Sequence, residues 1–493
     1  MIEKNLYLST AIPITDISSR MFFFEENQPS ISFGIHKVYA PITKVPIIMK
    51  GLTKNTISVS SFASTIIKLG PSHYRLYSTN YPFSFKTMYI ALWESGDGII
   101  WYPLKVSRHG KFSSNSICIN GIPGNQDMIG QPQVLHLADN VWYMYFWKHK
   151  EGHCRYLRAE SRDGLNWAVV DFDNPVLYHP NDQGLYAWAM GTSLRKIKNL
   201  QITRKEAEKH LKLISNDATY VYYNEYLKRF ECYSVWLHPE VRERSRYKGE
   251  AGKPKGIIRF IHKRVSSDGI NWSYPEVILL PDYRDPWDLQ FYYLSVQWHD
   301  KWLIGNLGYY RTEEGQDTTD MDLCFSKDGQ SWHRPVRGGF IPRVENKPDA
   351  MGIYAPNTWI DKGNKWLCLY TGTPDPHDED IHRASIMGAT FDKNRFVGLQ
   401  AGKVTGGFLS DVFILQNANI KVDACIKGWM RAEICDAFGN AIKDFHLMDS
   451  YVISGDKSEH ILRWKQSDTK DLKYRALRLR IEFREGVIYS FCF

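Results

Sequence analysis

The sequence predicts an all-β protein: a five-bladed β-propeller followed by a C-terminal β-sandwich. Three observations predict this fold. A turn motif occurs four times, each time after a similar succession of strand-like segments. Aromatic residues make up 14% of the chain, which suits the pleated surfaces of packed sheets. From about residue 406 short alternating strands continue without a further copy of the motif.

Composition narrows the class of protein. The chain has 493 residues, 43% of them hydrophobic, so it can bury a large core and is not a disordered chain. No apolar run approaches the roughly 18–20 residues that cross a bilayer, and an acid follows the first residues closely, so we expect neither a membrane span nor a secretory signal. The net charge of +8 is mild, and the densest basic stretch, 196–212, also carries acids at helical spacing. We therefore expect no nucleic-acid partner.

The eight cysteines are scattered and form no CxxC pair. They predict buried free thiols in a reducing cytoplasm.

The repeated motif reads S-x-D-G-x-x-W, and its copies begin at Ser95, Ser161, Ser266 and Ser326. An Asp-Gly pair is a tight-turn signal, because the Asp side chain caps backbone N–H groups and Gly adopts positive φ. The Ser adds a local hydrogen bond, and the Trp anchors the outgoing strand. We expect these to be structural hairpin turns and not catalytic aspartates.

Each motif follows two strand-like segments, and a fifth unit has the same opening without the Asp-Gly turn. The segments are 65–69 and 74–78, 132–137 and 141–146, 219–223 and 230–235, 293–297 and 301–305, and 357–360 and 365–370. Five four-stranded units predict five propeller blades. The third unit is longer, with an expected helix at 203–213 and a charged insertion at 240–254.

These patterns divide the chain into three parts. Residues 1–50 form an irregular lead-in with one strand-like run at 21–24, residues 51–405 the propeller, and residues 406–493 the sandwich.

Acidic residues at the starts of the innermost strands are the candidates for catalysis, since side chains from different blades converge there. Asp217, Asp288 and Asp349 precede the inner strands of units three, four and five. Convergent carboxylates suit glycoside hydrolysis: one protonates the leaving oxygen, another is nucleophile or base, and a third binds hydroxyls. For each acid alone, capping of a loop is the alternative.

Substrate binding is assigned to Asp127, in the equivalent lead-in of unit two, and to Trp287, His377 and Arg383. A plain surface loop is the alternative for the last two. Signatures of serine hydrolases and P-loops are absent. No spacing of ligands predicts a metal, and we expect no cofactor.

The four turns, the five units and the trailing sandwich resemble the five-bladed propeller glycoside hydrolases of families 32, 43, 68 and 117. The segments 259–264, 281–286 and 489–491 are similar to uncharacterised bacterial members of that superfamily. The resemblance implies a glycosidase that cleaves furanosides, arabinosides or related sugars. It also implies a catalytic Asp at the first inner strand, but the corresponding stretch, 54–64, has no carboxylate. The family's acid triad is therefore not carried over.

Three functions follow from this sequence. The first is a cytoplasmic glycoside hydrolase or related glycan-processing enzyme with a carbohydrate substrate. The second is a propeller-type glycoside phosphorylase, with His377 and Arg383 binding phosphate. The third, favoured by the missing acid and the many aromatic residues, is a non-catalytic carbohydrate-binding protein. The sugar, the linkage, the stereochemical outcome and the oligomeric state are left open.

Overall fold

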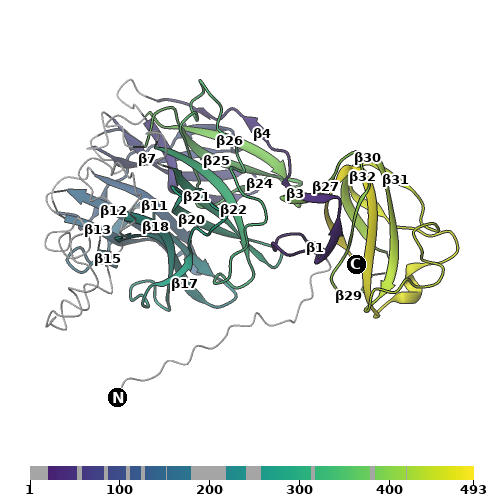
Figure 1. The fold of residues 1–493 in the computed structure, drawn as a ribbon. Helices are drawn as coiled ribbons and strands as arrows, with labels where there is room; N and C mark the ends of the chain where they lie inside the picture. Colours follow the sequence, from purple (N-terminus) through teal and green to yellow (C-terminus); the bar gives the residue numbers. More distant parts are fainter. Residues whose placement is uncertain are drawn as a thin grey trace, which may run out of the picture.

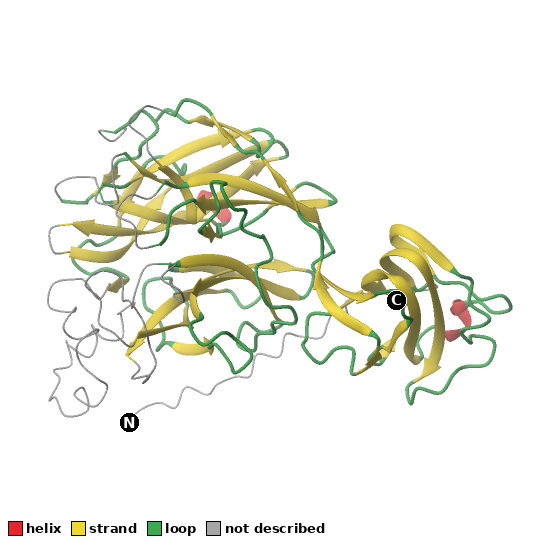
Figure 2. Cartoon of the chain, turned by 45° about the horizontal axis from the view of Figure 1, so that its top comes forward, coloured by secondary structure: helices red, strands yellow, loops and turns green. Residues whose placement is uncertain are grey.

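The computed structural model describes residues 20–52, 58–82, 87–106, 112–123, 128–150, 153–178, 218–239, 257–311, 317–377, 383–417 and 419–493. Within these ranges the chain is all-β, and helix is confined to two short 3-10 turns, Ala138–Asn140 and Thr469–Leu472 (Figure 2). None of the helices in the described ranges is long and apolar enough to cross a membrane. The helix expected at 203–213 and the insertion at 240–254 lie outside the described residues.

The first three units form separate sheets, each with its strands largely in antiparallel order (Figure 1). Unit 1 consists of β5 (Ile48–Met49), β6 (Ser58–Gly70), β7 (His73–Tyr81), β8 (Tyr89–Ser95) and β9 (Ile100–Pro103). Unit 2 consists of β10 (Ile119–Asn120), β11 (Ile129–His136), β12 (Trp142–Lys150), β13 (His153–Ser161), β14 (Trp167–Val169) and β15 (Leu177–Tyr178). Unit 3 consists of β16 (Tyr220–Asn224), β17 (Arg229–Pro239), β18 (Ile257–Ser266) and β19 (Glu276–Leu279).

Units 4 and 5 share one eight-stranded sheet. Unit 4 consists of β20 (Gln290–His299), β21 (Trp302–Arg311) and β22 (Thr318–Ser326). Unit 5 consists of β23 (Gly352–Tyr354), β24 (Ile360–Asp361), β25 (Lys365–Thr373), β26 (Ser385–Asp392) and β4 (Thr43–Val45). The two units are joined by a short parallel pairing, Thr319 with Gly352.

The inner strand expected at 357–360 is instead divided between β23 and β24. Pro356 lies between them, and a proline has no N–H to donate to a sheet.

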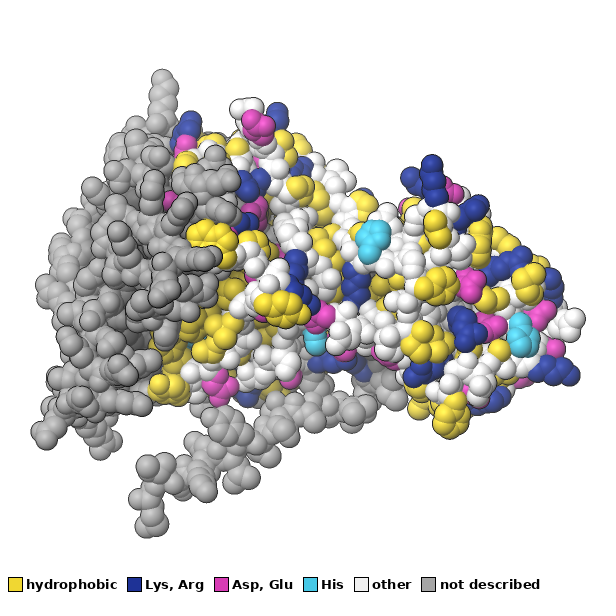
Figure 3. All heavy atoms as spheres, in the orientation of Figure 1, with side chains coloured by type: hydrophobic (Ala, Val, Ile, Leu, Met, Phe, Trp, Pro, Cys, Tyr) yellow, Lys and Arg dark blue, Asp and Glu magenta, His cyan; other side chains and the backbone are white. Residues whose placement is uncertain are grey.

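The C-terminal body is a nine-stranded sheet folded around its own core (Figure 1). It consists of β1 (Arg20–Phe22), β2 (Ile31–Phe33), β3 (Ile35–Tyr39), β27 (Val397–Ala401), β28 (Gly406–Leu409), β29 (Phe413–Ile414), β30 (Lys421–Asp436), β31 (Ile453–Ile461) and β32 (Ala476–Cys492). It begins before residue 406, because β27 already pairs with β32. On the face in Figure 3, its Lys and Arg side chains lie among Asp and Glu side chains.

The N-terminal segment, residues 20–49, is not irregular, and that expectation is wrong for this part of the chain. Its first three strands pair with β32, β28 and β27 of the C-terminal body. The next, β4, pairs with β26 of unit 5, and β5 pairs with β9 of unit 1. Sequence alone hides this role, because strands of two to five residues show too little alternation to be recognised.

The four repeated motifs form the turns that the sequence predicts. In the first, Asp97 Oδ1 accepts from the N–H groups of Ile99 and Ile100 at 2.8 and 2.9 Å, and Ser95 Oγ accepts from Gly98 N–H at 2.8 Å. The same bonds recur in the other three copies. Each motif glycine has a φ of 69–74°, a conformation that favours glycine.

Each turn also contacts the preceding unit. Tyr77 of unit 1 donates to the carbonyl of Gly164 at 2.8 Å, and Tyr145 of unit 2 donates to that of Gly269 at 2.9 Å. In the next copy, Lys263 of unit 3 donates to the carbonyl of Gly329 at 3.4 Å. The turn of unit 1 meets unit 5, where a Cβ on Gly98 would lie 2.8 Å from the Ile360 side chain. The motif therefore forms a contact between units as well as a hairpin.

A methyl group at Gly269 tests this contact. A Cβ there would lie 2.2 Å from the Tyr145 hydroxyl, and φ is +71°. We expect Gly269→Ala to lower the free energy of unfolding by about 2–5 kcal/mol, the sum of roughly 1–2 for the left-handed backbone and 1–3 for the clash. Gly363 is the control, since its φ is +82° but open space surrounds it. Equal losses in Gly269→Ala and Gly363→Ala, measured by urea unfolding, would contradict the proposed contact.

Glu26, in the connection between β1 and β2, ties the N-terminal segment to the chain after β22. Its carboxylate accepts from the Arg334 N–H at 2.6 Å and lies 2.7 Å from His333 Nδ1. Burial alone would raise the pKa of Glu26, but the hydrogen bonds from His333 and Arg334 outweigh it and lower the pKa to about 2.

The lowered pKa gives a pH dependence. The ionised Glu26 stabilises the fold above the unfolded-state pKa of about 4.3, and this stability is lost as the pH falls toward about 2. We expect the difference in unfolding free energy between the unaltered protein and Glu26→Gln to be present at pH 5, where the carboxylate is ionised in both states. It should shrink between about pH 4.5 and 2. A difference that does not change over this range would show that the carboxylate makes no special contribution.

Candidate functional site

Irregular backbone marks the inner strands of several units at similar positions. Register shifts occur in β6 between Ser60 and Thr65, in β11 between Gly130 and Gln133, and in β20 between Phe291 and Leu294. Such bulges redirect side chains and are common beside active sites.

Two non-glycine residues within these shifts have positive φ, Ala63 at 46° and Gln131 at 54°, and so does Ala218, just before β16, at 56°. The N–H of Ala218 donates to Gln131 Oε1 at 3.1 Å, which links units 2 and 3. Strained non-glycine residues persist only where their surroundings hold them, and they gather at functional sites.

Five rings from four units meet at these bulges, and we call them the central aromatic cluster: Phe62, Tyr220, Tyr292, Tyr293 and Tyr354. The Phe62 ring lies 5.1–6.3 Å from the other four ring centroids. The Tyr220 hydroxyl donates to the carbonyl of Ala355 at 2.8 Å, and the Tyr293 hydroxyl donates to that of Ile353 at 3.0 Å. Burial raises the pKa of Tyr293 well above its ordinary value, so this hydroxyl stays protonated.

Phe62 belongs to the stretch of unit 1 in which the resembled families have an acid. Its half-buried ring lies among four tyrosines.

His377 lies against this cluster. Its Nδ1 is 2.9 Å from the Tyr354 hydroxyl, and its ring centroid is 5.0 Å from Tyr292 and 5.1 Å from Tyr310. Its backbone N–H donates to the carbonyl of Asp317 at 2.8 Å, which fixes the loop after β25. His377 as a whole is partly exposed.

Arg259 brings a buried cation to the same place. Its guanidinium lies 4.7 Å from the Tyr310 ring centroid and 5.8 Å from that of Tyr292. Gln290 Oε1 accepts from its Nη1 at 3.1 Å. Stacking on tyrosine faces holds such a guanidinium in one orientation.

Asp288 and Arg311 stand at the neighbouring ends of β20 and β21. Arg311 Nε lies 2.8 and 2.9 Å from the two carboxylate oxygens, and its Nη2 lies 2.7 Å from Oδ1. The Asp288 side chain is fully buried, whereas Arg311 is 30% exposed and the adjacent Trp287 is 48% exposed. A half-exposed aromatic residue therefore directly precedes the carboxylate that pairs with the guanidinium.

Asp349 has different surroundings. Its side chain is fully buried, pairs with Lys44 of β4, and accepts from the Tyr370 hydroxyl at 2.9 Å. Asp349 and Asp288 pair with different cations, Lys44 and Arg311.

The other expected site residues fall into two groups. Asp127 and Asp217 lie outside the described residues. Arg383 is described, and its exposed guanidinium pairs with Asp375 on the same loop. Across the described ranges, no group of three or more His, Cys, Asp or Glu side chains could hold a metal ion.

Several residues of this region were missed by sequence reasoning, among them Phe62, Arg259 and Tyr354. The adjacent pair Tyr292-Tyr293 at the start of an inner strand was an available signal, since two neighbours normally point to opposite faces of a sheet. The bulge that brings both rings into one cluster is not visible in the sequence.

No family model matches the chain, and no curated protein matches it. Among solved structures, one described as a glycoside hydrolase has 12% identity and a TM-score of 0.44, covering 72% of this chain and 92% of its own. A thermostable family-43 glycoside hydrolase has 13% identity and a TM-score of 0.43, covering 70% and 91%. An N-acetylgalactosamine deacetylase from F. plautii, in complex with blood group B trisaccharide, has 14% identity and a TM-score of 0.44, covering 73% and 96%.

Glycoside hydrolases are therefore among the structures similar to this chain, as the sequence predicts. At this identity and TM-score the similarity says nothing of activity or substrate.

The central aromatic cluster depends on buried hydroxyl bonds, and Tyr220→Phe tests one of them. The change removes the donor to Ala355 and leaves its buried carbonyl without that bond. We expect the free energy of unfolding to fall by roughly 1–3 kcal/mol. The control, Tyr226→Phe, alters a side chain that is 69% exposed and should change it by less than about 0.5 kcal/mol. Equal effects in urea unfolding would contradict a rigid centre.

Proposed function

We propose that this chain is a glycan-processing enzyme that hydrolyses a glycosidic bond at the starts of the inner strands. The observation that carries the proposal is the half-exposed Trp287 beside the Asp288–Arg311 pair. Aromatic faces stack on the C–H faces of sugars, and charged side chains bind their hydroxyl groups. A mostly aromatic surface with a few fixed polar groups is typical of small-molecule sites.

The proposed site continues along β20 and β21 to the central aromatic cluster. Tyr310 precedes Arg311, and its ring is 5.1 Å from His377 and 4.7 Å from the Arg259 guanidinium. In this proposal His377 contacts the sugar from the loop after β25, and Arg383 lies on the rim.

The five units, in this proposal, close into a ring, a five-bladed propeller over residues 51 to about 396. The contacts of the motif turns support it, because they run from unit 5 to unit 1 and onward to unit 4. The shared sheet of units 4 and 5 completes the series. Ring closure is what would bring inner strands of different units to one site.

The roles of the aspartates differ in this proposal. Asp288, beside a guanidinium, is suited to act as nucleophile or as base on water, since a neighbouring cation favours a charged carboxylate. Asp217, which precedes the central Ala218, is the candidate for the second carboxylate on its sequence position. Asp349 is as fully buried as Asp288, but its partners Lys44 and Tyr370 both belong to unit 5, so in this proposal it stabilises that unit.

A panel of nitrophenyl furanosides and pyranosides tests the function. Once a substrate is found, we expect Asp288→Asn to lower kcat by roughly 100-fold or more. The matched control is Asp423→Asn, because Asp423 lies in β30 of the C-terminal body, is equally buried and pairs with an arginine, Arg395. It should leave kcat within about twofold, since it lies outside the proposed site. Equal losses in both variants would sink the role of Asp288.

A second candidate is a carbohydrate-binding protein without catalysis. The stretch 54–64 favours it, since it carries Phe62 and no carboxylate, although the resemblance to glycosidases implies an acid there. Sugar binding that persists in Asp288→Asn, together with no turnover by the unaltered protein, would support this candidate. Turnover that requires inorganic phosphate would instead identify a phosphorylase.

A further inference from the structure

The connection between β19 and β20, residues 280–289, brings Trp287 and Asp288 to the proposed site. It has no strand pairing in this stretch, and Tyr283 at its tip is 93% exposed. Yet Asp285, in the same connection, has a side chain that is only 2% exposed. We call residues 282–288 the Trp287 loop.

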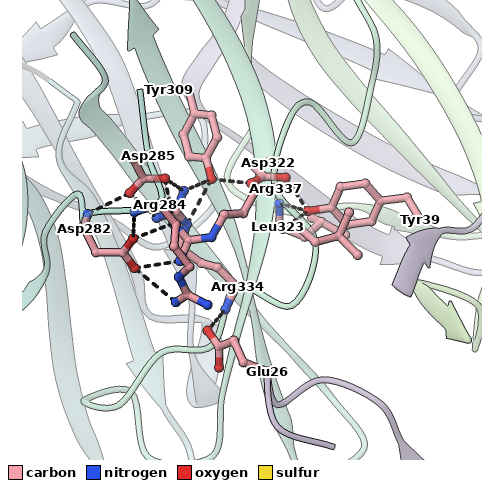
Figure 4. A network of polar contacts seen from close by, with 11 residues as sticks. Glu26, Tyr39, Asp282, Arg284, Asp285, Tyr309, Asp322, Leu323, Arg334 and Arg337 are labelled. Atoms are coloured by element: carbon pink, nitrogen blue, oxygen red, sulfur yellow. Dashed lines mark hydrogen bonds and ion pairs between the residues drawn. The ribbon is translucent and has the colours of Figure 1, made fainter. Parts of the chain in front are cut away.

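Two arginines that follow β22 hold the rear of the Trp287 loop (Figure 4). Arg334 donates to both oxygens of Asp285, at 2.8 and 2.7 Å. Arg337 donates to Asp285 at 2.7 Å and to both oxygens of Asp282, at 2.9 and 2.6 Å. Paired N–H bonds to a carboxylate fix direction as well as distance.

Arg334 is itself fixed. Its guanidinium lies 4.7 Å from the Phe291 ring centroid and 5.0 Å from that of Tyr309, and its Nε donates to the Tyr309 hydroxyl at 2.9 Å. Its backbone N–H donates to Glu26. The side chain is 4% exposed, so solvent screens these contacts little.

The same contacts extend to the N-terminal segment (Figure 4). The hydroxyls of Tyr309 and Tyr39 both donate to Asp322, whose side chain is fully buried. Tyr39 ends β3 of the C-terminal body, so the network connects that body with the Trp287 loop.

We propose that Arg334 and Arg337 are positioning residues: they hold the Trp287 loop so that Trp287 and Asp288 stand beside Arg311. This inference rests on the proposed function. One end of the loop is fixed at Asp282 and Asp285 by the two arginines. Its other end is fixed at Asp288, three residues after Asp285, by the bonds to Arg311. Trp287 lies between these fixed points. Neither arginine contacts the sugar in this proposal.

Amide hydrogen exchange and kinetics of the full chain test the proposal together. The first variant is Arg337→Gln, because Arg337 is 20% exposed and its loss is tolerable. The second variant, Arg334→Gln, removes the more deeply buried partner of Asp285. If Arg334→Gln does not fold, Arg337→Gln alone tests the positioning role. The matched control is Arg229→Gln in unit 3, where Arg229 is 26% exposed and pairs with the buried Glu231.

We expect Arg337→Gln to speed exchange of amides 282–289 by about tenfold or more, while those of β21 keep their rates. Arg229→Gln should leave amides 282–289 unchanged. On a glycan that the unaltered protein turns over, Arg337→Gln should raise KM by about fivefold or more with a smaller change in kcat, as for a displaced binding surface. Arg337→Lys keeps the charge but not the paired bonds, so it should give intermediate values.

Each outcome decides a separate point. Unchanged exchange in Arg337→Gln overturns the positioning role, whatever the function. Faster exchange with KM and kcat both unchanged also overturns it, because the network would then be structural only. If the unaltered protein neither binds nor turns over any glycan, the proposed function fails, and the exchange data alone show whether the arginines hold the loop.

Discussion

The contacts between successive units depend on the glycine carbonyl of a repeated hairpin turn. In each S-x-D-G-x-x-W turn, the Asp and Ser side chains accept from N–H groups of the turn, and in the first two copies the motif Trp donates to the glycine carbonyl at 3.0 and 3.2 Å. A tyrosine or lysine of the preceding unit reaches three of these carbonyls. The motif glycine adopts the left-handed conformation of the turn, and atoms of the neighbouring unit lie where a side chain would be. The same residue is therefore required both for the hairpin and for the close contact with the neighbouring unit.

The inner strands β6, β11 and β20 deviate from regular strand geometry, although the units are joined at their turns. Contacts at the turns join the units away from the inner strands, and the bulged strands add contacts of their own, such as the bond from Ala218 to Gln131. The bulges bring rings from several units together, with Phe62 among four tyrosines. The regular turns thus stabilise sheets whose inner strands contain strained residues, as is common at functional sites.

The fold was largely predictable, because a repeated turn motif and alternating strands are local signals. The turn geometry and the all-β class follow from them, whereas the C-terminal body begins before residue 406 and includes strands from residues 20–39. The N-terminal strands were not predictable, because short segments such as Ile48–Met49 gain their structure only from distant partners. For the same reason, the site could be predicted only in part. Asp288 and Trp287 could be chosen from their position, but the partners Arg311 and Arg334 come from other strands and loops, and no spacing in the sequence connects them.

The pairing of residues 20–39 with the last strands has a consequence for how the chain folds. Arg20 donates to Ser490 at 2.8 Å across a separation of 470 positions. During synthesis these first strands emerge long before β27, β28 and β32 exist, so they wait unpaired while units 1–4 form. Such distant contacts slow folding more than they cost in stability, because the entropy of closing a loop grows only slowly with its length. Arg20 and Cys492 are paired in one ladder, so the two ends of the described chain adjoin. In a circular permutant that joins these ends, the pairing of residues 20–39 with the last strands would become local in sequence.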